Sequence, residues 1–392
     1  MLRRLRMTLA DFFQQADLVL LGLCCISTLF GMGLIASATH YRGSTRYLIV
    51  QGTAMALGIG CYIILSMVDV ERIMKKWNWI AIFNLVFIGL LLTPLGVGGD
   101  TTGNQAWLHI PGIPFQIGPA EFVKISFTLL LAKQMEWLRE EKRDLKSFSS
   151  AAQVAGHTVI LMGWYVMISG DMGNALTFFF IFLCMAFAAG FALRWFALVL
   201  VGGAGAFAAA WMLDLMPTYM KDRFIAIMDH SYQPLEVGWQ QSRSLLALGS
   251  GGITGQGYLH GTQTQSDYNS SLPYRWTDFI FSVAGEELGL LGCLVVLGLL
   301  VAIIVRVLLV AKRSQTAFQC CVCVGMAAML MFQTIINTGM CLFVMPTIGI
   351  TLPFFSYGGS SVVTLYLAMG VVSGIKKRSP NNFRRPVWRR LR

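Results

Sequence analysis

Long apolar stretches recur along almost the whole chain, and they limit the possible folds more than any other feature. A helix of about 20 apolar residues is enough to cross the hydrocarbon core of a bilayer. Hydrophobic residues make up 56% of the 392 residues and charged residues only 12%, about half the usual charged share. A water-soluble chain could not bury that much apolar surface. The sequence therefore predicts an all-α polytopic membrane protein.

Ten segments are long and apolar enough to be spanning helices, although the fourth and fifth also carry polar residues. They are Leu18–Ala38, Tyr47–Met67, Trp77–Val97, Pro119–Trp137, Ala152–Ser169, Asn174–Phe191, Trp195–Leu213, Leu288–Val310, Phe318–Met340 and Leu352–Ile375. We expect the first segment to be retained as a span, because no convincing cleavage site follows it. The pattern predicts one integral membrane domain over residues 1–392, with both termini on the same side.

Basic residues predict which side that is. With both termini in the cytoplasm, 23 of the 30 lysine and arginine residues lie in inner segments, as the positive-inside rule requires. The same bias accounts for the net charge of +11. The basic tail, at about 376–392, directly follows the last span. It therefore indicates binding to anionic membrane lipids and not to nucleic acid.

One connection, at about 214–287 between spans seven and eight, is far longer than the others. Loops above about 15 residues are usually functional or disordered. This one carries tryptophans and apolar segments, so we expect it to be partly helical on the outer membrane surface. It ends in Arg275, Asp278, Glu286 and Glu287. Ionisable groups at a water–lipid boundary are costly unless they are used, which makes Asp278 the first candidate for catalysis.

The same loop contains Gly238-Trp239-Gln240-Gln241-Ser242, followed by Arg243 and further glycines. Glycine allows the backbone to approach a ligand closely, so the run could line a ligand site or be a flexible connector. It lacks the strand–glycine–helix context of a nucleotide site.

A second irregular run, at 346–361, contains two prolines and three glycines. It predicts either a broken segment that opens into a cavity or a kinked helix packed through small residues.

Polar residues inside the apolar segments are further candidates. Glu121 and Lys124 are three residues apart and share one helix face, so they form either a structural ion pair or part of a site. Asp171 lies at a helix junction, and Gln333 and Asn337 share one face of the ninth span. Such residues face the bundle interior. The nine cysteines all lie in or beside apolar runs, which is typical of packing residues and not of disulfides or metal ligands.

At this point the motifs resemble the SEDS proteins (shape, elongation, division and sporulation), which include FtsW, RodA and SpoVE. The resemblance covers nearly the whole chain in order. It rests on Leu272-Pro273, Thr277-Asp278-Phe279-Ile280-Phe281, Glu286-Glu287-Leu288-Gly289, Gln333 with Asn337, and Ser356-Tyr357-Gly358-Gly359-Ser360. The chain departs from the family pattern at Gln105, Ala106, Gly118, Ala120, Gly170 and Trp276.

The resemblance implies a peptidoglycan glycosyltransferase that polymerises lipid II at the outer face of the bacterial cytoplasmic membrane, with a class B penicillin-binding protein as partner. The family's essential aspartate corresponds to Asp278. The residues assigned to substrate binding are Glu121, Lys124, Arg223, Gln241, Ser242, Arg243, Arg275 and Ser356. A lipid II flippase and a non-catalytic scaffold for the penicillin-binding protein remain as alternatives.

The expected chemistry joins the 4-hydroxyl of an acceptor sugar to the anomeric carbon of a donor. A hydroxyl is a weak nucleophile, so a carboxylate base is expected, and the pyrophosphate leaving group needs positive charge. Arg223, Arg243, Arg275 and Lys124 are candidate cations. A divalent ion, Mg²⁺ or Mn²⁺, is another source of that charge. Glu286 and Glu287 would then bind the metal or, alternatively, cap the following helix.

Overall fold

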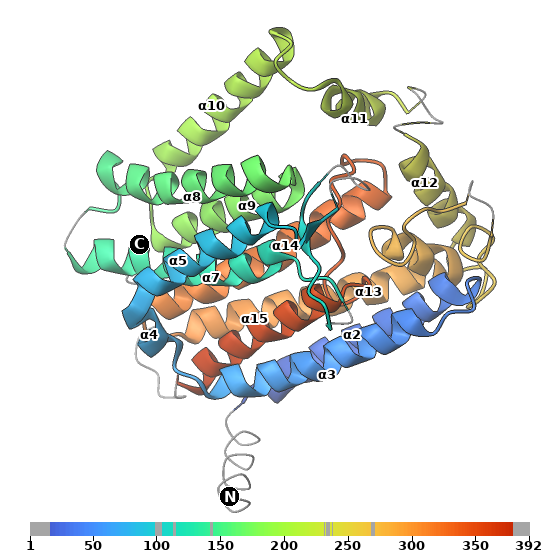
Figure 1. Ribbon diagram of the computed structural model, residues 1–392, viewed down its shortest axis with the longest axis horizontal. Helices are drawn as coiled ribbons and strands as arrows, with labels where there is room; N and C mark the ends of the chain where they lie inside the picture. Colours follow the sequence, from blue (N-terminus) through green and yellow to red (C-terminus); the bar gives the residue numbers. More distant parts are fainter. Residues whose placement is uncertain are drawn as a thin grey trace, which may run out of the picture.

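The computed structural model describes residues 16–98, 104–112, 115–141, 144–230, 232, 236, 238–267 and 271–378. Figure 1 shows a bundle of long helices. The helices are α2 (Leu18–His40), α3 (Arg46–Met67), α4 (Val70–Ile73), η1 (Met74–Lys76), α5 (Trp77–Gly89), η2 (Leu90–Leu92), α7 (Pro119–Glu140), α8 (Phe148–Ser169), α9 (Met172–Ala189), α10 (Leu193–Met212), α11 (Thr218–Met228), α12 (Trp239–Gly251), α13 (Ile280–Arg313), α14 (Ala317–Cys341) and α15 (Gly359–Lys377). Two short strands, β1 (Gly96–Val97) and β2 (Trp107–Leu108), pair antiparallel beside the bundle.

The predicted multi-pass architecture is confirmed. Among the residues described, nine helices are long and apolar enough to cross a membrane. The one predicted span not among these nine is the fourth, Pro119–Trp137, which corresponds to α7, a helix of 22 residues. This helix carries Glu121 and Lys124 near its start, together with further charges toward its end, and is correspondingly less apolar. Helices α11 and α12 lie within the long connection, which is therefore partly helical, as expected.

The last span differs from the prediction. It was expected to begin at Leu352, whereas α15 begins at Gly359, and residues 342–358 are non-helical. The reason is local. Pro346 and Pro353 cannot donate helical hydrogen bonds, and Phe354 adopts a positive φ of 66°. The prolines and glycines thus produce an irregular segment inside the bundle and not a kinked helix.

The eighth span also begins earlier than predicted. Helix α13 starts at Ile280, and a break at Gly289, where φ is 66° and ψ is −163°, divides it. The part before the break packs against α12, where a Cβ added to Gly251 would lie 1.9 Å from the carbonyl oxygen of Gly285. The part after the break is long enough to span the bilayer, so the predicted start at Leu288 lies close to the break.

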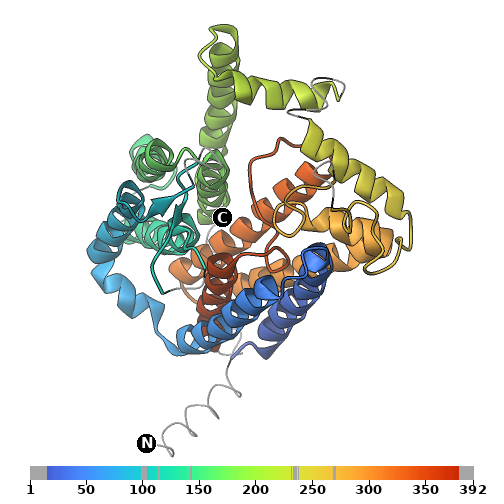
Figure 2. The ribbon, with the colours of Figure 1, turned by 45° about the vertical axis from the view of Figure 1, so that its right-hand side comes forward.

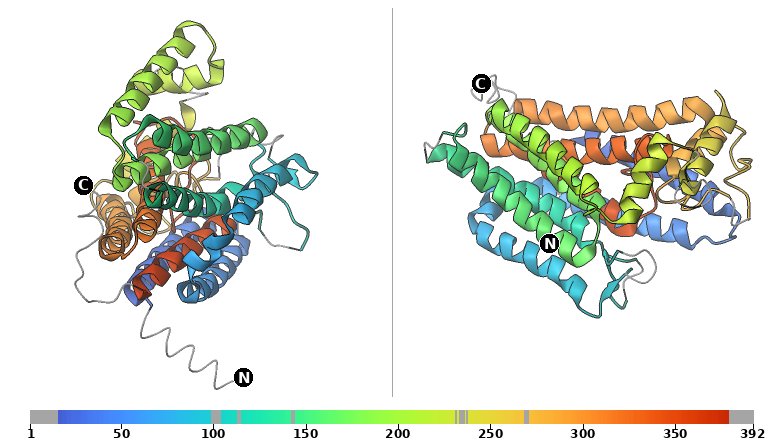
Figure 3. Two further views of the ribbon diagram at one scale, coloured as in Figure 1. Left: turned by 90° about the vertical axis from the view of Figure 1, so that its left-hand side faces the viewer. Right: turned by 90° about the horizontal axis from the view of Figure 1, so that it is seen from above.

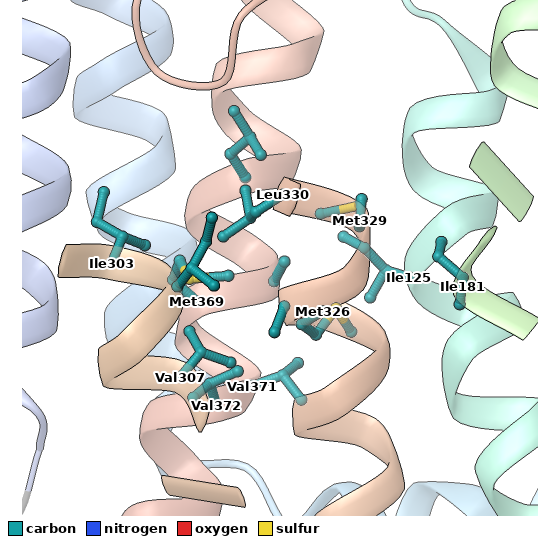
Figure 4. Packing of buried hydrophobic residues seen from close by; sticks show 14 of the residues in the cluster. Ile125, Ile181, Ile303, Val307, Met326, Met329, Leu330, Met369, Val371 and Val372 are labelled. Atoms are coloured by element: carbon teal, nitrogen blue, oxygen red, sulfur yellow. The ribbon is translucent and has the colours of Figure 1, made fainter. Parts of the chain in front are cut away.

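The centre of the bundle is formed by α14 and α15, which are the most completely buried of the spans. Figure 4 shows how apolar side chains from five helices meet there. They are Ile125 from α7, Ile181 from α9, Ile303 and Val307 from α13, Met326, Met329 and Leu330 from α14, and Met369, Val371 and Val372 from α15. This packing positions the ends of the same helices, where the polar residues gather.

A buried charge cluster joins the first and last helices. Asp17 is fully buried and caps α2 by accepting a hydrogen bond from the backbone N–H of Leu20. Its carboxylate pairs with Arg306 of α13 at 2.9 Å and with Lys376 of α15 at 3.1 Å. The Tyr62 hydroxyl of α3 donates to the Asp17 carbonyl. Four helices are thus tied together at this end of the bundle.

Helix α10 is the exception to this close packing, because none of its residues is buried. Figures 2 and 3 show it projecting away from the other helices, with α11 turning back from its far end. The ring of Phe207 on α10 meets Phe224 on α11 at 5.2 Å, edge to face. An apolar helix that its protein neighbours leave unburied is what a lipid environment permits.

Candidate active site

The loop that carries Asp278 is held in place through its own main chain. Three consecutive carbonyl oxygens in this loop accept hydrogen bonds from elsewhere in the bundle. The Trp276 carbonyl accepts from the backbone N–H of Tyr357 at 2.8 Å. The Thr277 carbonyl accepts from the Ser356 hydroxyl at 2.6 Å, and the Asp278 carbonyl accepts from the Asn337 side-chain amide at 2.7 Å. These bonds use only the main chain of Asp278, so its side-chain carboxylate remains available for a ligand.

The irregular segment at 346–358 is what this loop rests on, and two polar side chains from the spans hold it. Asn337 of α14 bonds to the carbonyl of Ile350 as well as to Asp278. Gln51 of α3 donates to the Ser356 carbonyl and accepts from the backbone N–H of Gly358, both at 3.1 Å. Buried backbone groups need partners of this kind in an apolar setting. The two amides therefore make an irregular segment tolerable next to Asp278.

The environment of Asp278 suits a base near neutral pH. Its side chain is half-buried at the start of α13. Burial raises the pKa of Asp278 to about 6, and the negative charge of Asp171 adds to the effect. Both causes disfavour the ionised form. A carboxylate tuned in this way accepts a proton more readily than an ordinary aspartate.

Asp171 belongs to a second polar group, formed by the starts of α7 and α9. Lys124 donates to the Glu121 carboxylate at 2.8 Å and to the Asn174 amide oxygen at 3.1 Å. Asn174 donates in turn to Asp171 at 2.7 Å, and the Tyr165 hydroxyl donates to the same Asp171 oxygen at 2.8 Å. Lys124 is fully buried. The predicted pair of Glu121 and Lys124 is thus part of a chain of hydrogen bonds that leads to Asp171.

A close backbone contact brings the two groups together. A Cβ added to Gly173, at the start of α9, would lie 2.5 Å from the carbonyl oxygen of Ile348. Only glycine allows α9 to approach the irregular segment this closely. Asn337 is hydrogen-bonded both to this segment, at Ile350, and to the Asp278 backbone. The contact at Gly173 therefore fixes Asp171 relative to Asp278.

Two more of the predicted substrate residues lie at this segment. Arg223 of α11 donates to the carbonyl of Thr347 at 2.7 Å. Ser356 is buried, and its hydroxyl accepts from the backbone N–H of Leu352 while donating to Thr277. Arg223 brings a positive charge toward the site, whereas Ser356 acts on the backbone of the Asp278 loop.

The remaining predicted substrate residues lie elsewhere. Gln241 is buried on α12 and donates to the carbonyls of Met340 and Met345. Arg275 is also buried and donates to the carbonyls of Gln263, Thr264 and Ser266. These contacts are structural and leave little of either group for a ligand. Ser242 and Arg243 are half-buried on α12.

Glu286 is a poor metal ligand in this arrangement, whereas one carboxylate oxygen of Glu287 is buried without a described hydrogen-bond partner. Glu286 is fully buried, and its two oxygens accept four hydrogen bonds, from the backbone and hydroxyl groups of Thr262, Gln263 and Thr264. Glu287 accepts from Ser37 and Gln265. Within the described ranges, no three or more histidine, cysteine, aspartate or glutamate residues are grouped to hold a metal. Neither glutamate caps the start of α13, and the hydrogen bonds of both fix the long connection.

Three residues of the site were not identified from the sequence: Gln51, Tyr165 and Asn174. Gln51 lies alone on an apolar helix, and a polar residue there usually faces the bundle interior. Asn174 follows Asp171 by three residues, and its backbone N–H donates to the Asp171 side chain in an N-terminal cap. That spacing is a recognisable signal. Tyr165 gives none, because an isolated tyrosine in an apolar segment usually serves packing.

Comparison with known proteins shows close relatives. Residues 10–381 match the family model of the cell cycle proteins FtsW, RodA and SpoVE. The probable peptidoglycan glycosyltransferase FtsW of Geobacter sulfurreducens is 30% identical over 372 residues, which cover 93% of this chain and 96% of the relative. The peptidoglycan glycosyltransferase MrdB of Escherichia coli K12 is 31% identical over 322 residues, which cover 82% of this chain and 83% of the relative.

Solved structures agree with this similarity. A chain from a peptidoglycan synthase complex that coordinates polymerization and crosslinking superposes with a TM-score of 0.77 at 26% identity, covering 94% of this chain and 99% of that one. The crystal structure of the rod shape determining protein RodA from Thermus thermophilus superposes with a TM-score of 0.67 at 26% identity, covering 94% of this chain and 98% of that one.

Proposed function

Because the chain belongs to the family of cell cycle proteins FtsW, RodA and SpoVE, we propose that it polymerises lipid II with Asp278 as the catalytic base. The protein is a multi-pass membrane glycosyltransferase of peptidoglycan synthesis, like the curated relatives that it matches over most of their length. The observation that carries the assignment of Asp278 is its setting: a half-buried carboxylate with a pKa raised to about 6, on a loop whose backbone is fixed at three consecutive residues.

In the proposed reaction, the 4-hydroxyl oxygen of the acceptor sugar attacks the anomeric carbon of the donor. The hydroxyl proton passes to the Asp278 carboxylate as the new glycosidic bond forms. The bond from the anomeric carbon to the pyrophosphate oxygen breaks, and the lipid pyrophosphate leaves with the electron pair. A single displacement of this kind inverts the anomeric centre. Positioning the two sugars against a fixed base lowers the barrier.

Positive charge for the leaving group is proposed to come from Lys124 and Arg223. Lys124 is fully buried and held by Glu121 and Asn174, so its positive charge would act on the pyrophosphate from a fixed position and without direct contact. Arg223 uses one N–H on the Thr347 carbonyl and has others to offer. Fixed cations stabilise the charge that develops on a leaving pyrophosphate.

The wider setting belongs to the same proposal. Both termini lie in the cytoplasm, the active site faces the outer side of the inner membrane, and the basic tail contacts anionic lipids. That tail falls outside the described residues after 378. A class B penicillin-binding protein is the proposed partner. The single membrane domain over residues 1–392 is consistent with a family match that runs unbroken from 10 to 381.

The decisive experiment compares the purified protein with its Asp278→Asn variant in an assay with fluorescent lipid II, with polymer resolved on a gel. Asparagine keeps the size of the side chain but cannot take up the proton, so the rate should fall about a hundred- to ten-thousand-fold. Asp267→Asn removes an exposed carboxylate from the same outer connection and should polymerise normally. Normal polymer from Asp278→Asn would refute the catalytic role. Passage of lipid II across vesicles without polymer from the wild type would instead indicate a flippase.

A further inference from the structure

We propose that Arg42 and Arg46, together with Tyr41, Tyr47, Trp276 and Tyr357, form a diphosphate-binding platform beside the Asp278 loop. We further propose that it holds the pyrophosphate of a lipid-linked substrate. This inference rests on the proposed function and extends it to residues between α2 and α3, for which the reaction chemistry alone gives no role.

Arg42 is held in one orientation by aromatic neighbours. Its Nε donates to the Tyr41 hydroxyl at 2.7 Å, and its Nη1 donates to the Tyr47 hydroxyl at 2.8 Å. Its guanidinium lies 4.4 Å from the centre of the Trp276 ring. Arg42 is nevertheless exposed. A flexible arginine loses conformational entropy when it binds a ligand. The Arg42 side chain is already fixed, so binding a ligand costs it less entropy.

The aromatic rings connect this arginine to the active-site loop. The Tyr47 ring lies 5.6 Å from that of Trp276 and 5.1 Å from that of Tyr357. The backbone N–H of Tyr357 donates to the Trp276 carbonyl, and Asp278 follows Trp276 by two residues. A ligand held by Arg42 therefore sits against the same loop that positions the base.

Arg46 brings a second positive charge to the same place. It is exposed at the start of α3, and its charge acts on the Tyr357 hydroxyl, partly offsetting the rise in the pKa of Tyr357 caused by burial. Neither Arg42 nor Arg46 takes part in an ion pair within the described parts of the chain. Two accessible cations without an acidic partner are typical of a site for an anion.

The chemistry of the platform fits a diphosphate. Arginine offers several N–H donors in a fixed plane and binds phosphate oxygens with two parallel bonds. Arg42 lies in the connection between α2 and α3 and Arg46 is the first residue of α3, so the two guanidinium groups can share two phosphate groups. At a membrane surface this chemistry could come from the pyrophosphate of the substrate or from the phosphate of an ordinary anionic lipid, and the experiment separates these sources.

The test uses the full-length protein in nanodiscs and measures KM and kcat for lipid II at several fractions of phosphatidylglycerol. Arg46→Gln, which breaks no described side-chain hydrogen bond, should raise KM about three- to tenfold, and Arg42→Gln about tenfold or more, with kcat little changed. Arg42→Lys should lie between wild type and Arg42→Gln, because lysine keeps the charge but not the planar donors. Lys221→Gln removes an outer positive charge whose partner Asp214 is exposed, and KM should stay unchanged.

A binding measurement gives an independent readout. Retention of undecaprenyl pyrophosphate by the protein in the same nanodiscs should weaken in Arg42→Gln and Arg46→Gln and not in Lys221→Gln. Unchanged KM and unchanged retention would overturn the platform, even with an active wild type. An effect that disappears without phosphatidylglycerol would also overturn it, by assigning the arginines to bulk lipid. If the wild type makes no polymer, the proposed function fails, and retention of the diphosphate still decides the platform.

Discussion

Asp278 and Asp171 come from loops that are far apart in sequence, and the negative charge of Asp171 makes Asp278 harder to ionise. The Asp171 carboxylate accepts three hydrogen bonds, from the Tyr165 hydroxyl and from the side-chain amide and the backbone N–H of Asn174. Asp278 lacks such donors on its carboxylate in the described hydrogen bonds, and its pKa is raised to about 6. The raised pKa of Asp278 suits it to the role of the proposed base.

This difference predicts the pH dependence of the reaction. A base must be ionised, so kcat/KM should fall below a pH of about 6 with the slope of a single proton. Asp171→Asn removes the negative charge that raises the pKa of Asp278. Its single amide oxygen can still accept from the backbone N–H of Asn174 and so keep the helix cap, but it cannot also replace the second carboxylate oxygen, to which Tyr165 donates. The acidic limb of the profile should then move to lower pH. A profile that does not move would show that Asp171 does not act on the base.

The same shift has a consequence for stability. The folded protein binds a proton at Asp278 more tightly than the unfolded chain does, so this residue contributes stability when it is protonated and loses that contribution as the pH rises through about 6. Asp278→Asn, which is neutral at every pH, should therefore not lower the melting temperature at pH 7. This is why the loss of polymer in that variant can be read as a loss of chemistry.

At the scale of elements, the break in α13 is the feature most dependent on a single residue. Gly289 has φ 66° and ψ −163°, a region open almost only to glycine, where other residues cost about 1–3 kcal/mol. An added Cβ would also lie 2.4 Å from the backbone nitrogen of Gly255 and from the carbonyl oxygen of Ile253. Two separate penalties therefore act on any side chain at this position.

Gly289→Ala should lower the melting temperature in detergent by several degrees and reduce the yield of folded protein. The matched control is Gly298→Ala, in the same helix, where an added Cβ meets nothing within 4 Å. That change should be neutral or slightly stabilising, because alanine favours helix. Equal effects of the two substitutions would mean that the break does not depend on glycine.

The elements also show how far sequence alone could lead. Apolar stretches predicted the helices, and prolines with glycines predicted the irregular segment, because both signals are local. Asp278 and the pair of Glu121 and Lys124 were found for the same reason. Gln51 was missed because its partner Ser356 lies 305 residues away, and no local pattern says which spans are neighbours. Gln241 was assigned to substrate because it lies in a glycine-containing run of the long connection that could line a ligand site, whereas its backbone partners Met340 and Met345 follow only from the packing of α12.

At the scale of the whole molecule, the distribution of basic residues predicts the orientation. In a cysteine-free background, a cysteine at the exposed Thr254 should react with an impermeant maleimide added to intact cells, after removal of any outer membrane. A cysteine at the exposed Lys312 should react only after the membrane is opened. Both sites lack described side-chain contacts, so the substitutions should not disturb the fold. Labelling of both positions from outside would contradict the predicted topology.

The charge cluster at Asp17 also sets an order of events during synthesis. Asp17 is made almost first, but its partner Arg306 follows 289 residues later, and Lys376 comes later still. At about 5–20 residues per second, the ribosome needs roughly 15–60 seconds to make the first of these counter-charges. During that interval the carboxylate must remain in water or find a temporary partner. The first helix can therefore enter the membrane early, yet it takes its final place only when the chain is nearly complete.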